Sequence, residues 1–76
     1  MTRLTRAINP MPEDVRLALD RNGLADAYAA RPDYQRNDYL GWIVRAKREE
    51  TRLKRLNQML DELRRGGVYM NMLWRG

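Results

Sequence analysis

The chain is short and basic: it has 76 residues, a formal net charge of +5, and no cysteine or histidine. At this length we expect one domain with a single small core, for which 43% of hydrophobic residues is sufficient. The lack of cysteine excludes a disulfide scaffold and a thiolate metal site, and the lack of histidine removes the commonest general base and metal ligand.

The chain also carries no signal for a membrane. A membrane-spanning helix needs about 18 consecutive apolar residues, and no apolar run in this chain is nearly that long. Residues 1–10 also lack the apolar region of a signal peptide. We therefore expect a soluble, cytoplasmic protein without a membrane span, a metal or a cofactor. Residues 39–76 contain nine basic and four acidic side chains, and a basic half of this kind permits an acidic partner without requiring one.

The first helix is expected to begin at Pro12. A proline suits the first helical position, because its fixed φ fits the helix and its missing N–H is not needed there. Glu13 and Asp14 follow in the first turn, where the helix dipole favours negative charge. The pair Asn22-Gly23 predicts the end of this helix, since both residues tolerate the left-handed backbone of a helix terminus.

A shorter helix is predicted over residues 24–30, and a third over about residues 34–47, with Asp33 as the N-cap of the third. Helical spacing predicts that the following side chains face the core: Leu24, Ala27, Tyr28, Tyr39, Trp42, Ile43 and Ala46, with Leu40 and Val44 on the flank. Gly41 weakens a helix by about 1 kcal/mol relative to alanine. We therefore expect it to allow the close approach of a neighbouring helix.

The fourth helix has the clearest pattern. Its apolar residues recur at intervals of three and four and form one narrow stripe: Leu53, Leu56, Met59, Leu60 and Leu63. Arg64 and Arg65 suit its last turn, and Gly66-Gly67 predicts its end. The predicted fold is therefore all-α, a small bundle of three to four short helices, with residues 1–11 as an extended lead and residues 12–76 as the single domain.

The C-terminal tail VYMNMLWRG is apolar and fits two structures. Its alternation favours an extended segment, but the spacing of Tyr69, Met72 and Leu73 would also suit one helical turn. Either way we expect the tail to pack on the bundle. It could cover the groove between the first and last helices, or it could offer an apolar interaction surface whose candidate residues are Tyr69, Met70, Met72 and Trp74.

Two blocks of sequence resemble a known family. The first block comprises Tyr39, Trp42-Ile43, Ala46-Lys47, Glu50-Thr51-Arg52 and Arg55-Leu56, and the second comprises Pro12-Glu13-Asp14-Val15 and Ala18-Leu19. In this order they resemble the helical C-terminal domain of the YdeI/OmpD-associated (bacteriocin-protection) family, over about residues 12 to 65. Family members commonly have proline where this chain has Glu49, so we expect a less sharp separation of the third and fourth helices. The resemblance implies a bacterial cytoplasmic module linked to resistance against antimicrobial peptides or bacteriocins.

Four cations at the junction of the third and fourth helices are candidate contacts for an anion or a partner: Lys47, Arg48, Arg52 and Arg55. The structural alternative is that Arg52 and Arg55 bond to carbonyls at a helix end or to acids of the first helix. We favour the structural alternative for these two arginines.

The pattern does not indicate an enzyme. Without histidine or cysteine, catalysis would require carboxylates, lysine or tyrosine. The only acidic doublets, Glu13-Asp14, Glu49-Glu50 and Asp61-Glu62, are expected in terminal turns or on exposed faces. We therefore expect a non-enzymatic module, a monomer or weak dimer, that binds an unknown protein partner. Weak, sequence-nonspecific binding of nucleic acid through residues 45–55 is the alternative, and it is not favoured because Glu49 and Glu50 interrupt the cations.

Overall fold

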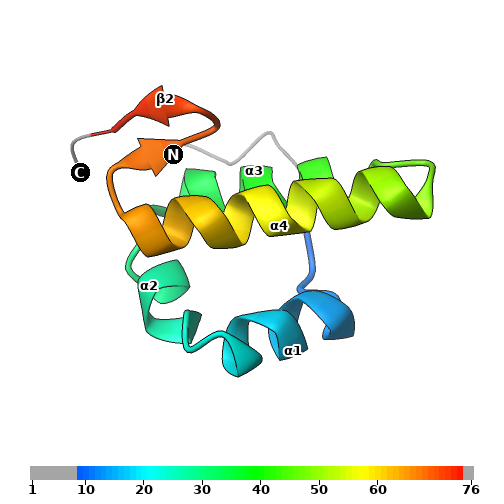
Figure 1. The fold of residues 1–76 in the computed structure, drawn as a ribbon, viewed down its shortest axis with the longest axis horizontal. Coiled ribbons are helices and arrows are strands. Elements are labelled where there is room, and N and C mark those ends of the chain that lie inside the picture. The colour runs from blue at the N-terminus through cyan, green and yellow to red at the C-terminus, as the bar shows by residue number, and fades with distance from the viewer. Residues whose placement is uncertain (1–8, 75–76) are drawn as a thin grey trace, which may run out of the picture.

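The computed structural model describes residues 9–74, which form four helices followed by a β-hairpin (Figure 1). The elements are α1 (Glu13–Arg21), α2 (Ala25–Ala29), α3 (Asp33–Val44), α4 (Glu49–Arg65), β1 (Val68–Tyr69) and β2 (Met72–Leu73). The small helical bundle predicted from the sequence is thereby confirmed. The predicted extended lead falls mostly on residues 1–8, which lie outside the described residues.

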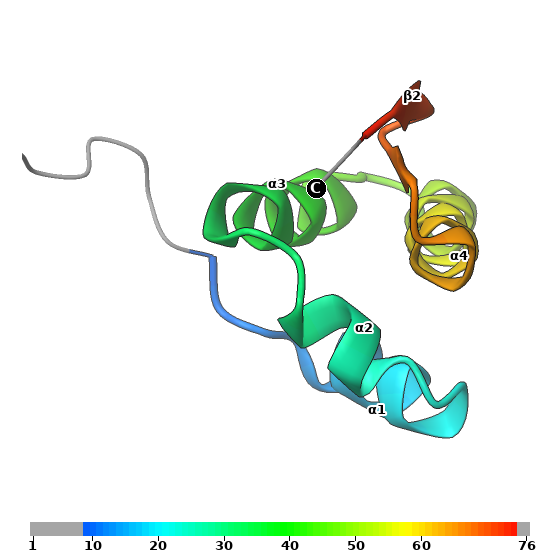
Figure 2. The same cartoon turned by 90° about the vertical axis from the view of Figure 1, so that its left-hand side faces the viewer.

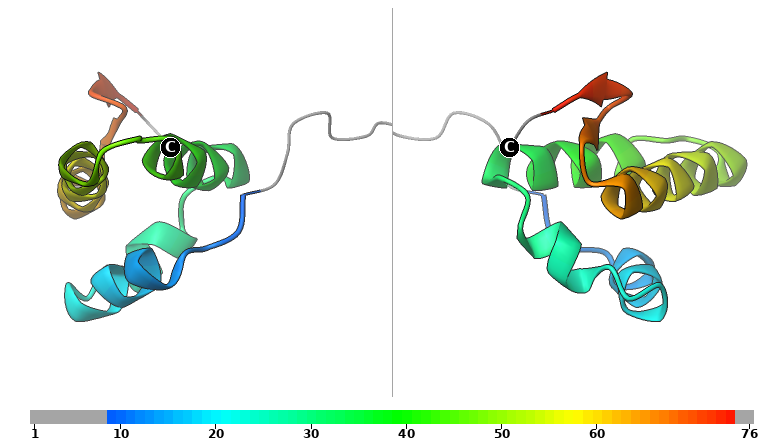
Figure 3. Two further views of the ribbon diagram at one scale, coloured as in Figure 1. Left: turned by 90° about the vertical axis from the view of Figure 1, so that its right-hand side faces the viewer. Right: turned by 60° about the vertical axis from the view of Figure 1, so that its left-hand side comes forward.

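The helices form two layers. α3 and α4 lie side by side and run antiparallel, and α1 and α2 pack together beneath them (Figures 2 and 3). Residues 45–48 join α3 to α4 without helical structure. The prediction that these two helices are less sharply separated is therefore wrong. Arg48 has an extended backbone, with φ −107° and ψ 146°, which separates the two helices. α4 therefore begins at Glu49 although no proline precedes it.

Prolines and glycines lie at half of the helix ends, with small shifts from the predicted positions. Pro12 and Pro32 are the extended residues immediately before α1 and α3, so α1 begins one residue later than predicted and Asp33 is the first residue of α3 rather than its cap. Gly23 and Gly66 adopt left-handed φ values of 65° and 82° after α1 and α4, as a glycine at a helix end allows.

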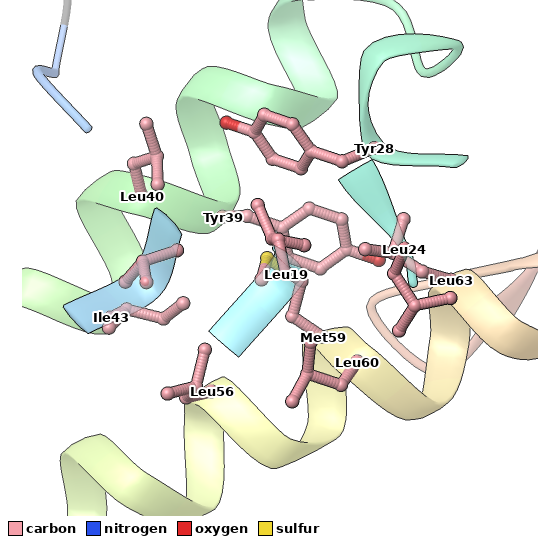
Figure 4. Close-up of a cluster of buried hydrophobic side chains, with 11 residues drawn as sticks. Leu19, Leu24, Tyr28, Tyr39, Leu40, Ile43, Leu56, Met59, Leu60 and Leu63 are labelled. Carbon is pink, nitrogen blue, oxygen red and sulfur yellow. The ribbon is translucent and has the colours of Figure 1, made fainter. Parts of the chain in front are cut away.

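One core is shared by all four helices (Figure 4). Its buried hydrophobic side chains are Val15, Leu19, Leu24, Tyr28, Tyr39, Leu40, Ile43, Leu56, Met59, Leu60 and Leu63. Ala18, Ala27, Trp42, Tyr69 and Met70 are partly buried against this set. Burial of these side chains supplies the main driving force for folding.

The observed core differs from the predicted one in α3 and in α4. Leu53 is 48% exposed, although it lies on the apolar stripe of α4. α4 has 17 residues against 9 in α1, so α1 covers only part of its length (Figure 1). Leu40 is buried rather than flanking the core, and Trp42 is only partly buried. α3 ends at Val44, three residues before the predicted end, so Ala46 lies in the connection.

Gly41 allows a close approach, but not of a helix. A Cβ atom at this position would lie 2.8 Å from Nδ2 of Asn9 and 3.0 Å from Nη1 of Arg45. Asn9 is held there by Asn37, whose Oδ1 accepts the backbone N–H of Asn9 at 2.7 Å. The missing side chain of Gly41 therefore makes room for the segment that leads into α1.

Candidate functional site

The C-terminal tail is a hairpin with a two-residue turn, so the extended alternative is confirmed and the helical one is wrong. β1 and β2 are antiparallel, with Tyr69 opposite Met72, and the turn residues Met70 and Asn71 have φ values of 51° and 65°. Positive φ at both positions is typical of the tight turn whose twist matches a hairpin. This backbone is unfavourable for a methionine, so other contacts must stabilise the turn.

A single carboxylate holds the turn. Glu62 Oε1 accepts the N–H of Met70 and Oε2 accepts the N–H of Asn71, both at 2.8 Å. The hydroxyl of Tyr39 and the Nε2 atom of Gln58 also donate to this carboxylate, whose residue is only 1% exposed. The prediction that the Asp61-Glu62 doublet lies on the surface is therefore wrong for Glu62. Its position three residues after Met59, on the inward face of α4, is the signal that could have indicated burial.

The surroundings of Glu62 act on its pKa in opposite directions. Burial raises the pKa, but the hydrogen bonds from Tyr39, from the turn amides and from Gln58 outweigh it and bring the pKa below its ordinary value of 4.5. Burial, followed by the hydrogen bond to Glu62, raises the pKa of Tyr39. The two side chains therefore form a pair in which a neutral phenol donates to an ionised carboxylate.

Arg31 extends this polar cluster and was not singled out from the sequence. It is 4% exposed, and its guanidinium donates to Oε1 of Gln35 and to the backbone carbonyl of Glu62, each at 3.0 Å. The same guanidinium lies 4.8 Å from the ring centroid of Trp74. The residue after β2 is thus attached to the bundle by a cation–π contact.

One strand of the hairpin packs on the helices, and the other is exposed to solvent. Tyr69 packs edge-on against Tyr39 and Tyr34, with ring centroids 5.4 and 5.8 Å apart, and its hydroxyl donates to Asp38. β1 therefore covers α3 and α4, not the groove between α1 and α4. In β2, by contrast, Met72 is 58% exposed and Leu73 is 86% exposed.

We refer to Val68, Met72 and Leu73 as the hairpin surface. Val68 and Leu73 share one face of the hairpin, whereas Met72 lies opposite Tyr69 on the other face. Of the four candidate tail residues, only Met72 belongs to the hairpin surface. Tyr69 and Met70 are partly buried against the core, and Trp74 is partly buried over Arg31. Leu73, which is outside that candidate set, is the most exposed large hydrophobic residue in the described part of the chain.

The four candidate cations divide into two pairs. Arg52 donates to both carboxylate oxygens of Asp14 on α1, at 3.0 and 3.2 Å, and this contact lowers the pKa of Asp14. Arg55 donates to the backbone carbonyl of Trp42 at 2.6 Å and lies 5.4 Å from the centroid of its ring. These are the internal contacts that the structural alternative predicts. Lys47 and Arg48 are exposed in the connection between α3 and α4.

Other kinds of site have little support within residues 9–74. No three or more carboxylates gather there in an arrangement that could hold a metal ion. None of the helices in this range is long and apolar enough to cross a membrane. Within residues 9–74, the hairpin surface and the exposed pair Lys47 and Arg48 are therefore the two candidate sites.

A family model described as bacteriocin-protection, YdeI or OmpD-associated, matches residues 10–66. The chain belongs to this family. The match covers all four helices and stops immediately before the hairpin, so it confirms the family resemblance of the two sequence blocks. Searches of curated proteins and of solved structures gave no match. The family assignment therefore accounts for the bundle, while the hairpin lies outside the matched residues.

Proposed function

We propose that this chain is a non-enzymatic protein-interaction module that contributes to the protection of bacteria against bacteriocins or antimicrobial peptides. Membership of the bacteriocin-protection family supports the biological setting. The observation that carries the interaction is the exposure of Met72 and Leu73 on a hairpin whose turn is fixed by the buried carboxylate of Glu62.

A fixed hairpin is a favourable place for a contact surface. Ordering flexible side chains and loops on binding costs free energy, and a surface that is already ordered avoids much of that cost. Met72 adds an adaptable side chain, and Leu73 adds apolar area that the fold leaves in water. The surface is small, so we expect weak or transient binding to a partner.

The environments of three carboxylates, Asp14, Asp61 and Glu62, support a module without catalytic activity. Glu62 is buried and uses both of its oxygens to hold Tyr39, Gln58 and the hairpin turn. Asp14 is paired with Arg52, and Asp61 is paired with Arg65 at 3.2 Å. These contacts give each of the three carboxylates a role in stabilising the fold.

The proposed interaction is tested by bacterial survival. Cells that lack the chain would be complemented with the wild-type chain, with Leu73→Lys or with Leu53→Lys, and exposed to a bacteriocin or an antimicrobial peptide. Leu53 is the matched control, because it is an exposed leucine on α4 and outside the hairpin surface. We expect Leu73→Lys to lose protection and Leu53→Lys to keep it. Equal protection by both variants, with both folded by circular dichroism, would contradict the proposal.

Nucleic-acid binding through the junction of α3 and α4 is the second candidate, supported by the exposure of Lys47 and Arg48. It is weakened because Arg52 and Arg55 are engaged within the chain. Titration with duplex DNA and single-stranded RNA at low salt tests it, and we expect no binding. An affinity that falls steeply with salt and is lost in Arg48→Glu would instead establish this function.

A further inference from the structure

The hydrogen bonds of the hairpin decide which backbone groups of β2 are free. The N–H of Trp74 donates to the carbonyl of Gly67 at 2.9 Å, and Val68 lies opposite Leu73. In an antiparallel ladder, hydrogen-bonded and non-hydrogen-bonded pairs alternate. Because Gly67 and Trp74 form a bonded pair, Val68 and Leu73 form a non-bonded one. The N–H and C=O of Leu73 therefore point away from β1, toward the outer edge of the hairpin.

This edge is open and carries no charge. Figures 1 and 2 show β2 on the far side of β1 from the helices, so the bundle does not obstruct its outer edge. Edge strands are commonly protected by charged residues, proline or bulges. Residues 66–74, GGVYMNMLW, contain no charged residue and no proline. The hairpin is also held in place by Glu62, so the edge is presented in a fixed position.

We propose that β2 pairs antiparallel with β2 of a second copy of this chain. The pairing is centred on Leu73, which lies opposite Leu73 of the second copy, and each donates its N–H to the other's carbonyl. A twofold axis passes between the two leucines, as required for a closed dimer in which both copies use the same surface. The result is a four-stranded antiparallel sheet with one bundle attached to each hairpin.

The side chains are self-complementary in this register. Met72 lies opposite Trp74 of the second copy, and a thioether beside an indole is a favourable contact. On the outer face, the two Leu73 side chains lie side by side and are flanked by Val68 from each hairpin, which gives a continuous apolar row.

The uncharged edge offers no electrostatic attraction to a charged partner. The net charge of +5 on each chain opposes self-association and weakens the dimer, but residues 72–74, which pair, are neutral and place no like charges against each other. Only this short segment of each copy pairs, so we expect a weak dimer that forms at high concentration. This inference goes beyond the proposed function, because it uses the backbone edge of β2. Of the hairpin surface it covers Met72 and leaves the outer face of Val68 and Leu73 in contact with solvent.

The test combines sedimentation with amide exchange on the full chain. We expect wild-type sedimentation to shift from monomer to dimer between micromolar and millimolar concentrations, while exchange of the Leu73 amide slows by about tenfold. Leu73→Pro removes the outward N–H without removing a bond to β1, and its fixed φ suits an edge strand. We expect this variant to stay monomeric, and Leu73→Val, which keeps the N–H, to dimerise.

Protection of the Met70 and Asn71 amides shows whether the hairpin persists in each variant, since both donate to Glu62. A wild-type chain that is monomeric at millimolar concentration, or a Leu73 amide that exchanges at a rate independent of concentration, would overturn the pairing. So would dimerisation of Leu73→Pro to the wild-type extent. A monomeric chain that still protects cells through Leu73 would overturn only this inference, and a dimeric chain without protective effect would overturn only the proposed function.

Discussion

The hydroxyl of Tyr39 donates a hydrogen bond to the carboxylate of Glu62, and both side chains are buried. The same carboxylate oxygen accepts the N–H of Met70 in the hairpin turn. One acidic side chain thus connects α3, α4 and the hairpin. A buried charge is tolerated only when its hydrogen bonds are satisfied, and here four donors satisfy it.

The first prediction concerns Glu62→Gln. An amide has one acceptor oxygen, and its NH₂ group would face a donor, so part of the network is lost. We expect the free energy of unfolding to fall by about 1–3 kcal/mol in urea denaturation. The Met70 and Asn71 amides should exchange faster. Asp61→Asn, one residue away on the exposed face, is the control and should change stability by less than about 0.5 kcal/mol. Equal effects of both variants would argue against this role of Glu62.

The second prediction concerns the loss of stability at acid pH through protonation of Glu62. Folding lowers the pKa of Glu62, because the hydrogen bonds to its carboxylate outweigh burial, so the charged form is favoured in the folded chain. Its stabilisation is complete above the ordinary pKa of the unfolded chain and is lost as pH falls through the lower folded pKa. We expect the free energy of unfolding to decrease as pH falls below 4.5. Glu62→Gln should show a shallower decrease, and parallel curves for the two proteins would contradict the assignment.

The third prediction ranks three arginines near the junction of α3 and α4 by their contribution to the stability of the fold. Arg55→Ala removes a charge-assisted hydrogen bond to the last turn of α3 and the contact with Trp42, and it should destabilise the fold by about 1.5–3 kcal/mol. Arg48→Ala changes an exposed residue and should cost less than about 0.5 kcal/mol. Arg52→Ala breaks an exposed ion pair and should lie between them, at about 0.2–1 kcal/mol. Thermal denaturation of the three variants gives the order, and a larger loss from Arg48→Ala would refute it.

The fourth prediction is a double-mutant cycle at Gly41. Alanine is the better helix former by about 1 kcal/mol, but its Cβ would displace the side chain of Asn9. We therefore expect Gly41→Ala to stabilise an Asn9→Ala background by about 0.5–1 kcal/mol and to give a smaller gain in the wild type. Chemical denaturation of the four proteins measures the coupling. Identical effects in both backgrounds would show that Asn9 does not restrict this position.

Local signals predicted much of the fold. Pro12 and the pair Asn22-Gly23 marked the ends of α1 to within one residue, and Gly66 marked the end of α4, because proline and glycine restrict or relax the backbone at their own position. The apolar period of α4 predicted the burial of Leu56 and Leu60. It failed at Leu53, because the period identifies the apolar face of a helix but not which positions on that face a neighbouring element covers.

The helices, their main ends, most of the core and the family follow from local sequence patterns. The polar cluster around Glu62, the contact of Asn9 with Gly41 and the exposure of Leu73 depend on how the elements pack together. The difference arises from the distance along the chain between the partners. Helix propensity and apolar period act over a few residues, whereas a buried charge is placed by donors from different elements, which meet only after the chain has folded.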